Sequence, residues 1–382
     1  LPSETMIWQP EFTDKTLSRK PGAVQVLMSQ HQYYPQLKWK PAEYESLMLL
    51  DQTTLSGFTP IITIPDIDWD YENECYKKSL SSYLSDFGIN LAASWKANRP
   101  VLLDVKYLDK HGSSRHHPLD MCIQDARVNG KEIIPVVSPA YSTNYIHAVQ
   151  RNLINGLAIS ITPQTWHQFT SLVNHLNIHP SLIDVIIDFG DIQNATDSLK
   201  QQALSMVNTL SGQAPWRNLI LSSTAYPASQ AGIPQHQVHH IPRHEYDLWM
   251  HVVQNFSNGR TPSFSDYPTA SSTITSVDPR FMSQYVSVRY SNDTSWIFVK
   301  GTAVKGNGWG QTKNLCTTLV SSPEYQVFGS KFSWGDDYIY QRSLGANKSG
   351  GSKEWRKVAH THHITLVVKQ LYWLAQTQPA KP

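Results

Sequence analysis

Charged and hydroxyl side chains recur at the ends of short apolar segments in this sequence. In residues 183–191, four of nine positions hold β-branched aliphatic residues, which is typical of a buried strand, and Asp188 stands near its end. Lysine and aspartate at such positions could bind an anion, hold a divalent cation or form ion pairs with one another. The side chains placed in this way are Lys38, Lys40, Asp66, Asp68, Asp104, Lys106, Ser138, Thr162, Asp188, Ser222, Ser223 and Asp266.

Two interpretations of these charges stay open. A buried charge is costly unless it is paired or hydrated, so the set forms either a structural network of ion pairs or a ligand site. A divalent cation bound by aspartate oxygens is a variant of the second interpretation, although the spacing of the acids is not specific for a metal. His360, His362 and His363 have no cysteine partner at ligand spacing, which disfavours zinc. We therefore assign no metal ligands, and the sequence identifies no cofactor.

The elements that would position these side chains form a repeating pattern. Eight apolar segments begin near residues 33, 60, 100, 132, 157, 183, 218 and 262, and each gap leaves room for one helix. Eight such units predict a closed parallel (β/α)8 barrel of the TIM-barrel type over residues 31–270, in which the C-terminal strand ends share one mouth. The alternative is an open doubly wound sheet, but no glycine-rich phosphate-binding motif follows the first strand.

The sequence changes in character on both sides of the predicted barrel. Residues 1–30 contain three prolines and no clear hydrophobic period, which predicts an N-terminal extension. Residues 284–301 predict a β-hairpin, and residues 353–375 predict a helix. We expect residues 271–382 to form an α+β extension that packs on the barrel and caps its mouth.

Composition and charge disfavour several classes of protein. A net charge of +2 and a pI near 8.3 provide no basic field over the whole molecule, although a local basic patch could bind nucleic acid. No apolar run approaches the roughly 20 residues that a membrane helix needs. The three cysteines are few and far apart, which favours a reducing compartment over a disulfide framework. With no signal-peptide pattern at its start, the chain is expected to be cytoplasmic and without a membrane partner.

Five short motifs occur in an order that resembles one known family. They are Tyr33-Tyr-Pro-Gln-Leu-Lys-Trp-Lys-Pro-Ala-Glu43, Ile241-Pro-Arg-His-Glu-Tyr-Asp-Leu-Trp249, Phe264-Ser-Asp-Tyr267, Phe332-Ser-Trp-Gly-Asp-Asp-Tyr-Ile339 and Trp355-Arg356 followed by His362-His-Ile-Thr365. Together they resemble the "beta protein" family of phages, prophages and bacterial defence cassettes, over about residues 31–375. The resemblance implies a role in antiphage defence or abortive infection beside partner proteins of the same cassette, in the cytoplasm of a bacterial host. It carries over no catalytic roles.

The residues that match these motifs are site candidates by resemblance only. They are Lys38, Lys40, Arg243, Glu245, Asp266, Tyr267, Trp334, Gly335, Asp336, Trp355, Arg356, His362 and His363. Three of the motifs lie in or near the C-terminal extension, which suggests that the extension and the barrel form one functional unit. We expect Asp336, Arg356 and His362 to approach the charged strand ends and close a shared pocket, with Arg356 paired to an acid in the absence of ligand.

Three functions are compatible with these observations. The first is a defence protein whose barrel mouth binds an anionic ligand, such as a nucleotide, nucleic acid or phage component, through lysine and arginine side chains. The second is a metal-dependent phosphodiesterase or nuclease in which Asp104, Asp188 and Asp266 hold the metal. The third is a structural subunit of a defence complex. Fold alone does not choose among them, and the sequence does not decide whether the chain is an enzyme or an oligomer.

Overall fold

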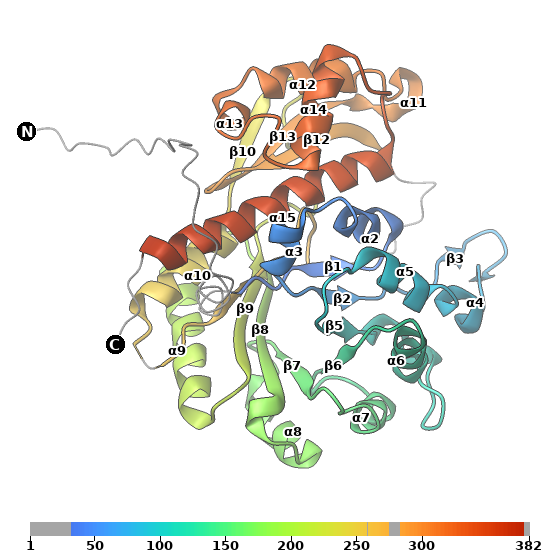
Figure 1. The fold of residues 1–382 in the computed structure, drawn as a ribbon, viewed down its shortest axis with the longest axis vertical. Coiled ribbons are helices and arrows are strands. Elements are labelled where there is room, and N and C mark those ends of the chain that lie inside the picture. Colours follow the sequence, from blue (N-terminus) through green and yellow to red (C-terminus); the bar gives the residue numbers. More distant parts are fainter. Residues whose placement is uncertain (1–31, 258, 275–282, 378–382) are drawn as a thin grey trace, which may run out of the picture.

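The computed structural model describes residues 32–257, 259–274 and 283–377, and its larger part is a parallel barrel (Figure 1). Backbone hydrogen bonds of 2.8 Å from Tyr34 N to Phe264 O and from Gln36 N to Asp266 O join the first and last strands. The predicted (β/α)8 barrel is therefore confirmed, and the open sheet is not observed. The strands, in their spatial order, are β1 (Gln36–Lys38), β2 (Ile61–Thr63), β5 (Val101–Asp104), β6 (Ile133–Val137), β7 (Leu157–Ile161), β8 (Ile183–Asp191), β9 (Asn218–Thr224) and β11 (Ser263–Ser265).

The barrel strands are short and apolar because both of their faces are buried. One face fills the barrel interior with a small cluster that includes Leu102, Ala158 and Ile186. The opposite face packs under the surrounding helices in a much larger cluster that includes Leu103, Ile159 and Ile187. Alternating residues of one strand thus enter two different cores, as the two-residue period of a strand requires.

Helices follow most of the strands and surround the barrel. Several begin at side chains that cap the free backbone N–H groups of the first turn, as Ser142 does for Tyr145 N and Thr196 for Leu199 N. The helices are α2 (Pro41–Leu47), α3 (Gln52–Ser56), α4 (Leu80–Leu84), α5 (Phe87–Ser94), α6 (Pro118–Val128), α7 (Thr143–Gln150), α8 (Phe169–Leu176), α9 (Asp197–Gln213) and α10 (His244–Asn255), with 3-10 turns η1 (Lys106–His111), η2 (Trp166–Gln168) and η3 (Pro180–Leu182). A two-stranded hairpin, β3 (Trp69–Asp70) with β4 (Cys75–Tyr76), follows β2.

The C-terminal extension contains the predicted hairpin, β12 (Tyr285–Ser291) with β13 (Ser295–Ala303), in an antiparallel sheet. The third strand of this sheet is β10 (Val238–Pro242), which pairs with β13 although it precedes α10 in the barrel part of the chain. Helices α11 (Val304–Asn307), α12 (Thr312–Val320), α13 (Pro323–Gln326) and α14 (Trp334–Leu344) complete the unit. The expected boundary at residue 270 is therefore crossed by one strand, and the expected extension over residues 1–30 lies outside the described residues.

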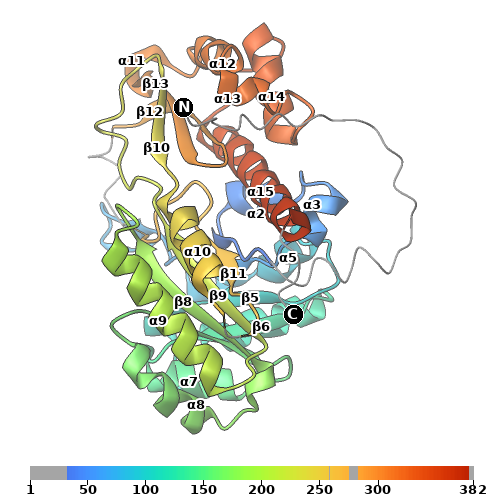
Figure 2. The same ribbon diagram turned by 90° about the vertical axis from the view of Figure 1, so that its left-hand side faces the viewer.

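Helix α15 (Ser352–Thr377) lies between the barrel and the C-terminal sheet (Figures 1 and 2). Every residue from 358 to 368 is buried, so this stretch has no solvent-facing side, as expected of a helix in the middle of a fold. It contacts α2 and α3 of the barrel on one side and α14 and β12 on the other. Polar side chains on α15 must therefore find partners within the protein or in a ligand. In the described part of the chain, no helix is long and apolar enough to span a membrane.

Candidate functional site

Asp104, at the C-terminal end of β5, is held by two tyrosines. Tyr141 Oη donates to Asp104 Oδ2 at 2.7 Å, and Tyr145 Oη lies 3.3 Å from Oδ1. Burial, and next the Asp104 carboxylate, raise the pKa of both tyrosines well above the usual range, so both hydroxyls keep their protons. Lys106 Nζ is 3.7 Å from Asp104 Oδ2, which gives the ion pair that the sequence had left open.

Asp188, at the barrel mouth, has a separate set of partners. Tyr267 donates a short hydrogen bond to Asp188 Oδ2, and the backbone N–H of Gly190 donates to Oδ1 at 2.9 Å. Gln36 Nε2 lies 3.4 Å from Asp188 Oδ2 and donates to Ser222 Oγ at 2.7 Å. The carboxylate is therefore satisfied by polar neighbours without a lysine in ion-pair range among the described residues.

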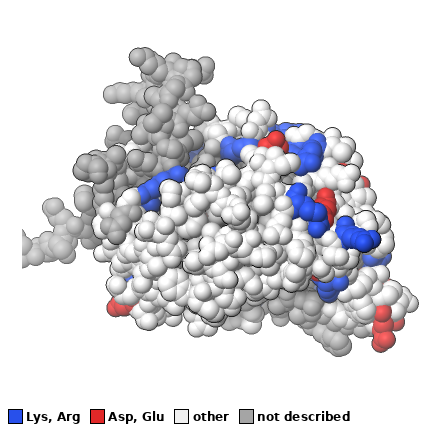
Figure 3. All heavy atoms as spheres, turned by 90° about the horizontal axis from the view of Figure 1, so that it is seen from below, with Lys and Arg blue, Asp and Glu red and all other residues white. Residues whose placement is uncertain are grey.

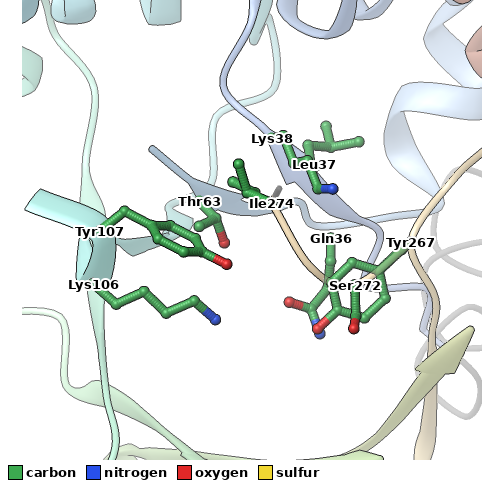
Figure 4. A pocket seen from close by; sticks show the side chains of 9 residues that line it. All are labelled: Gln36, Leu37, Lys38, Thr63, Lys106, Tyr107, Tyr267, Ser272 and Ile274. Atoms are coloured by element: carbon green, nitrogen blue, oxygen red, sulfur yellow. The ribbon is translucent and has the colours of Figure 1, made fainter. Parts of the chain in front are cut away.

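A narrow pocket at the barrel mouth is lined by partners of both aspartates, Lys106 of Asp104 and Gln36 and Tyr267 of Asp188. Figure 4 shows Lys106 and Tyr107 on one side of the opening, facing Gln36, Tyr267 and Ser272 on the other. Its volume is about 10 Å³, roughly the space of one water molecule. Among the described residues, this pocket is too small for an organic ligand.

A third group of predicted residues forms a buried junction between β11, α10 and α15. Asp266 Oδ1 accepts from Tyr33 Oη at 2.6 Å, and Oδ2 lies 2.8 Å from His363 Nε2. Arg243 Nε is 3.1 Å from Glu245 Oε1, and Arg243 Nη2 is 3.9 Å from Asp266 Oδ2. All five side chains are buried, so Arg243, Glu245 and Asp266 form an ion-pair network away from solvent, in which Arg243 Nη2 makes no hydrogen bond.

Ser291 extends this junction into a serine–histidine–aspartate arrangement, which was not predicted from the sequence. Burial lowers the pKa of His363 to about 4, so the imidazole is neutral. Its Nε2–H donates to Asp266, and its Nδ1 accepts from Ser291 Oγ at 2.9 Å. In a nucleophilic triad the serine bonds Nε2 and the acid bonds Nδ1, which is the reverse. Ser291 is fully buried, so this arrangement stabilises the junction instead of presenting a nucleophile.

Asp336 and His362 form a second closed network, between α14 and α15. Asp336 accepts from Tyr290 Oη at 2.6 Å and from Ser333 Oγ at 2.6 Å, and lies 3.0 Å from His362 Nδ1. His362 Nε2 is 2.7 Å from the Ser291 carbonyl oxygen. Both Asp336 and His362 are fully buried, and their polar atoms are bonded to these local partners. The expectation that they approach the charged strand ends is therefore not met.

The other predicted residues are scattered. Asp66 pairs with Lys110 Nζ at 2.5 Å and His111 Nε2 at 3.0 Å near the barrel rim. Lys40 is exposed at the residue before α2. Trp334 packs against Tyr338 in the core of the C-terminal unit, so it contributes to packing there.

A large cleft lies between the barrel mouth and the C-terminal sheet, with a volume of about 920 Å³. Its walls are Lys38, the loops 226–231 and 269–273, one edge of the β12–β13 hairpin and the first turns of α15. The cations in the lining are Lys38, Arg289, Lys300 and Arg356. None of the described lining residues is an aspartate or a glutamate. A cleft between barrel and extension therefore exists, but of the residues expected to form the shared pocket Lys38 and Arg356 line it, and Asp336 and His362 do not.

Two of the four cations have firm partners within the protein. Lys300 Nζ donates to the carbonyl oxygens of Gln230 at 2.6 Å and Ile233 at 3.3 Å, which ties down the loop after β9. Lys38 Nζ donates to the carbonyl oxygen of Thr273 at 2.6 Å, in the loop after β11. Both lysines are bonded to neutral oxygens, so their positive charge is not neutralised by these contacts.

The two arginines are much less satisfied. Arg356 Nη1 is 3.8 Å from Glu43 Oε1, an ion pair too long for a hydrogen bond, which matches the expected pairing with an acid. Burial, and next the charge of Arg289, lower the pKa of Arg356. Arg289 Nε is buried and, within the described ranges, has no hydrogen-bond partner. Arg289 and Arg356 thus line the same cleft and are close enough for their charges to interact, which costs free energy unless an anion lies near both.

Buried polar atoms without partners gather around this cleft. Among the described residues they include Tyr226 Oη, Thr269 Oγ1, Ser287 Oγ and Arg289 Nε, all from residues in the cleft wall. Glu43 Oε1 and both ring nitrogens of His360 are also without hydrogen bonds, and both residues neighbour Arg356. Arg243 Nη2 and His251 Nε2, outside the cleft wall, also lack hydrogen bonds. Buried polar groups are nearly always hydrogen-bonded, so the concentration at the cleft makes it the candidate site.

Sequence reasoning missed Arg289, Ser287 and Lys300. Their signal is the alternation in β12, where Tyr285, Ser287 and Arg289 share one face and the buried Val286 and Val288 share the other. The hairpin itself was predicted, but the polar face of a hairpin is usually solvent-exposed, so polar residues there do not by themselves indicate a binding site. Only the position of α15 and the barrel loops makes this face the wall of a cleft.

The aspartates considered for a metal site do not converge. Asp104, Asp188 and Asp266 each belong to a different hydrogen-bond network, as described above. Within the ranges that the structure describes, no group of three or more His, Cys, Asp or Glu side chains has an arrangement that could hold a metal ion. The geometry therefore favours the cationic cleft over these aspartates as the candidate site.

Comparison with known proteins places the chain in a family. No curated protein matches it. Among solved structures it is similar to a mutant tryptophan synthase alpha-subunit from Pyrococcus furiosus (TM-score 0.35, 12% identity, 62% of this chain and 86% of that chain). It is also similar to tryptophan synthase of Mycobacterium tuberculosis (TM-score 0.35, 10% identity, 64% and 85%). The sequence model described as "Beta protein" matches residues 33–369, nearly the whole described length. The chain therefore belongs to the Beta protein family.

Proposed function

We propose that this protein binds an anionic, phosphate-bearing ligand in the cleft between its barrel and its C-terminal unit. The observation that carries the proposal is the meeting of Lys38, Arg289, Lys300 and Arg356 in a wall without described carboxylates, next to buried polar atoms that lack partners. Guanidinium groups suit phosphate because their planar N–H donors match two of its oxygens at once.

The position of the cleft suggests what binding would do. Lys38 belongs to the barrel, Arg289 to the C-terminal sheet, and Arg356 to the helix between them. An anion that contacts all three would tie the two units together and favour one arrangement of them. We propose that partner proteins read this arrangement during antiphage defence, the role that the family resemblance implies.

A titration with inorganic tripolyphosphate tests the binding half of the proposal. We expect saturable binding to the full chain by calorimetry, weakening as salt rises because the contacts are electrostatic. Arg289→Gln and Arg356→Gln should each weaken binding at least about tenfold, since each removes charge-assisted hydrogen bonds. The matched control is Arg127→Gln, on the exposed surface of α6. Absence of binding, or equal affinity in all four proteins, would refute the proposal.

The defence half needs a separate assay in cells. Cells that carry the full chain with its neighbouring genes would be challenged with phage and compared with cells carrying Arg289→Gln or Arg127→Gln. We expect the cleft variant to lose protection at normal protein levels and the control to keep it. Full protection by a folded Arg289→Gln protein that no longer binds tripolyphosphate would separate the cleft from defence.

A further inference from the structure

Along the cleft wall formed by β12, the side chains change from aromatic to cationic. The face that lines the cleft presents the aromatic ring of Tyr285, the hydroxyl of Ser287 and the guanidinium of Arg289 in that order. Residues two apart on a strand are nearly 7 Å apart, so this series extends over roughly 14 Å. One end of the wall is therefore aromatic, and the other is cationic.

The aromatic end contains a second ring. The N–H of Val304 donates to the Gln284 carbonyl oxygen at 2.8 Å, which brings the segment after β13 beside the start of β12. Trp309, a few residues further on, is a cleft-lining residue and is only partly buried. Tyr285 is 43% exposed, and Lys300 Nζ lies 4.8 Å from its ring centre. An exposed aromatic ring in a polar cleft offers a surface on which a flat heterocycle can stack.

The cationic end has the features of a phosphate site. Arg289 on β12 and Arg356 on α15 are close enough for the charge of one to lower the pKa of the other. Ser287 lies between the two ends, and Thr269, from the loop after β11, also lines the cleft. Both carry buried hydroxyls without partners in the described structure. Hydroxyl groups donate and accept hydrogen bonds, so they suit the hydroxyls of a sugar as well as phosphate oxygens.

We infer that the ligand of the cleft is a nucleoside polyphosphate, with its base at Tyr285 and Trp309 and its phosphates at Arg289, Arg356 and Lys38. This inference rests on the proposed function, because it specifies which anion the cleft accepts. A volume of about 920 Å³ lies within the range of small-molecule and cofactor sites.

Charge distribution favours a small ligand over a nucleic acid strand. A strand would need a basic track that continues over the surface. The net charge of the chain is only +2, and the face of the barrel farthest from the C-terminal unit shows scattered charges of both signs on a mainly uncharged surface (Figure 3). On this face the charges form no continuous basic track, which favours a ligand with a few negative charges over a strand.

The test compares nucleotides with an inorganic anion of similar charge. The full chain would be titrated with the four ribonucleoside triphosphates, with tripolyphosphate and with a 20-nucleotide oligothymidylate. We expect at least one nucleoside triphosphate to bind about tenfold or more tightly than tripolyphosphate, because base stacking adds to the phosphate contacts. Tyr285→Ala should weaken the binding of this nucleotide roughly 5- to 100-fold and leave the affinity for tripolyphosphate unchanged. The matched control is Tyr340→Ala, a partly exposed tyrosine of α14 outside the cleft.

The outcomes separate this inference from the proposed function. Equal affinity for tripolyphosphate and all four nucleotides, unaffected by Tyr285→Ala, would overturn the nucleotide inference and leave an anion site. Tightest binding by the oligonucleotide would overturn it in favour of a nucleic acid. If neither the nucleotides nor tripolyphosphate nor the oligonucleotide binds, the proposed function is overturned together with the inference. Trp309→Ala, checked for an unchanged melting temperature, provides a second test of the stacking end.

Discussion

The buried junction around Asp266 and the cleft around Arg289 use the same types of residue in opposite ways. In the junction, Arg243 has two carboxylates within 4 Å, and it is fully buried. In the cleft, Arg289 and Arg356 are close enough for their charges to interact, and the acid paired with Arg356 among the described residues, Glu43, lies 3.8 Å away. Arg243 and Arg289 differ in charge compensation: Arg243 has two carboxylates in ion-pair range, although its Nη2 makes no hydrogen bond, whereas Arg289 has none among the described residues. A buried charge without a counter-charge is therefore the better candidate for a ligand site.

The largest expected effect comes from breaking the junction with Arg243→Met. Methionine fills a similar length but leaves Glu245 and Asp266 as buried carboxylates without their cation. We expect a loss of about 3–5 kcal/mol in the free energy of unfolding, measured by urea denaturation at neutral pH. Arg127→Gln should stay within about 0.5 kcal/mol of the unchanged protein. A loss for Arg243→Met as small as that of the control would show that the junction does not depend on this cation.

A smaller effect is expected from Asp336→Ala, which breaks the second closed network. The substitution removes the acceptor of Tyr290 and Ser333 and the partner of His362. Ser333 Oγ is only partly buried and His362 keeps its contact to the Ser291 carbonyl oxygen, so Tyr290 is the main buried group left without a partner. We expect a loss of about 1–3 kcal/mol and unfolding at lower urea concentration. The affinity of the folded variant for tripolyphosphate should change by less than about twofold, because Asp336 has no place in the cleft wall. Unchanged stability with lost anion binding would reverse our assignment of Asp336 to architecture.

Most of the barrel could be predicted from sequence because its signals are local. A strand buried on both faces is a short apolar run wherever its partners lie, and eight such runs with helix-sized gaps define the barrel. Strand β10 could not be found in this way. Its sequence, Val238-His-His-Ile-Pro242, is polar and half exposed, and it is a strand only because β13, more than 50 residues later, supplies its hydrogen bonds. A strand that depends on a distant partner leaves no period in its own sequence.

The candidate site was predicted less completely, for a different reason. Lys38 and Arg356 were found and do line the cleft, whereas Asp336 and His362, chosen on the same grounds, are buried with complete partners. Residue type cannot separate these cases, because a satisfied buried network and a ligand site use the same side chains. Arg289 was missed since its importance comes from α15 and the barrel loops that face it. What separates the cases is the set of neighbours, which only the fold supplies.

Glu43 is a buried acid that pairs with Arg356 of the cleft, and it should make the stability of the protein depend on pH. Burial raises the pKa of Glu43 from 4.5 to about 7, with Arg356 and next Lys38 acting in the opposite direction. The folded state therefore holds a proton that the unfolded state has lost between about pH 4.5 and 7. Stability from this group is complete below the unfolded pKa and falls as pH rises to about 7.

Glu43→Gln should remove this dependence. Glu245 is also raised to about 7 by burial, so the total slope of stability against pH contains both carboxyls. The difference between the unchanged protein and Glu43→Gln isolates Glu43, and we expect it to decrease from pH 4.5 to 7 and then level off. Urea denaturation at several pH values measures it. A difference that does not vary with pH would mean that Glu43 titrates alike in the folded and unfolded states.

The smallest expected effect on stability is that of Arg289→Gln, and for that reason it is the most informative. Arg289 has a buried Nε without a described partner and lies near Arg356, so its charge is not used to hold the folded chain together. Removing it relieves repulsion between two guanidinium groups and strands no carboxylate. We expect the free energy of unfolding without ligand to stay within about 0.5 kcal/mol or to rise slightly, while anion binding is lost. The ligand-free Tm should therefore match that of the unchanged protein, and only the latter should gain Tm when tripolyphosphate is added. A destabilisation as large as that of Arg243→Met would place Arg289 with the architectural residues, and the distinction between junction and cleft would fail.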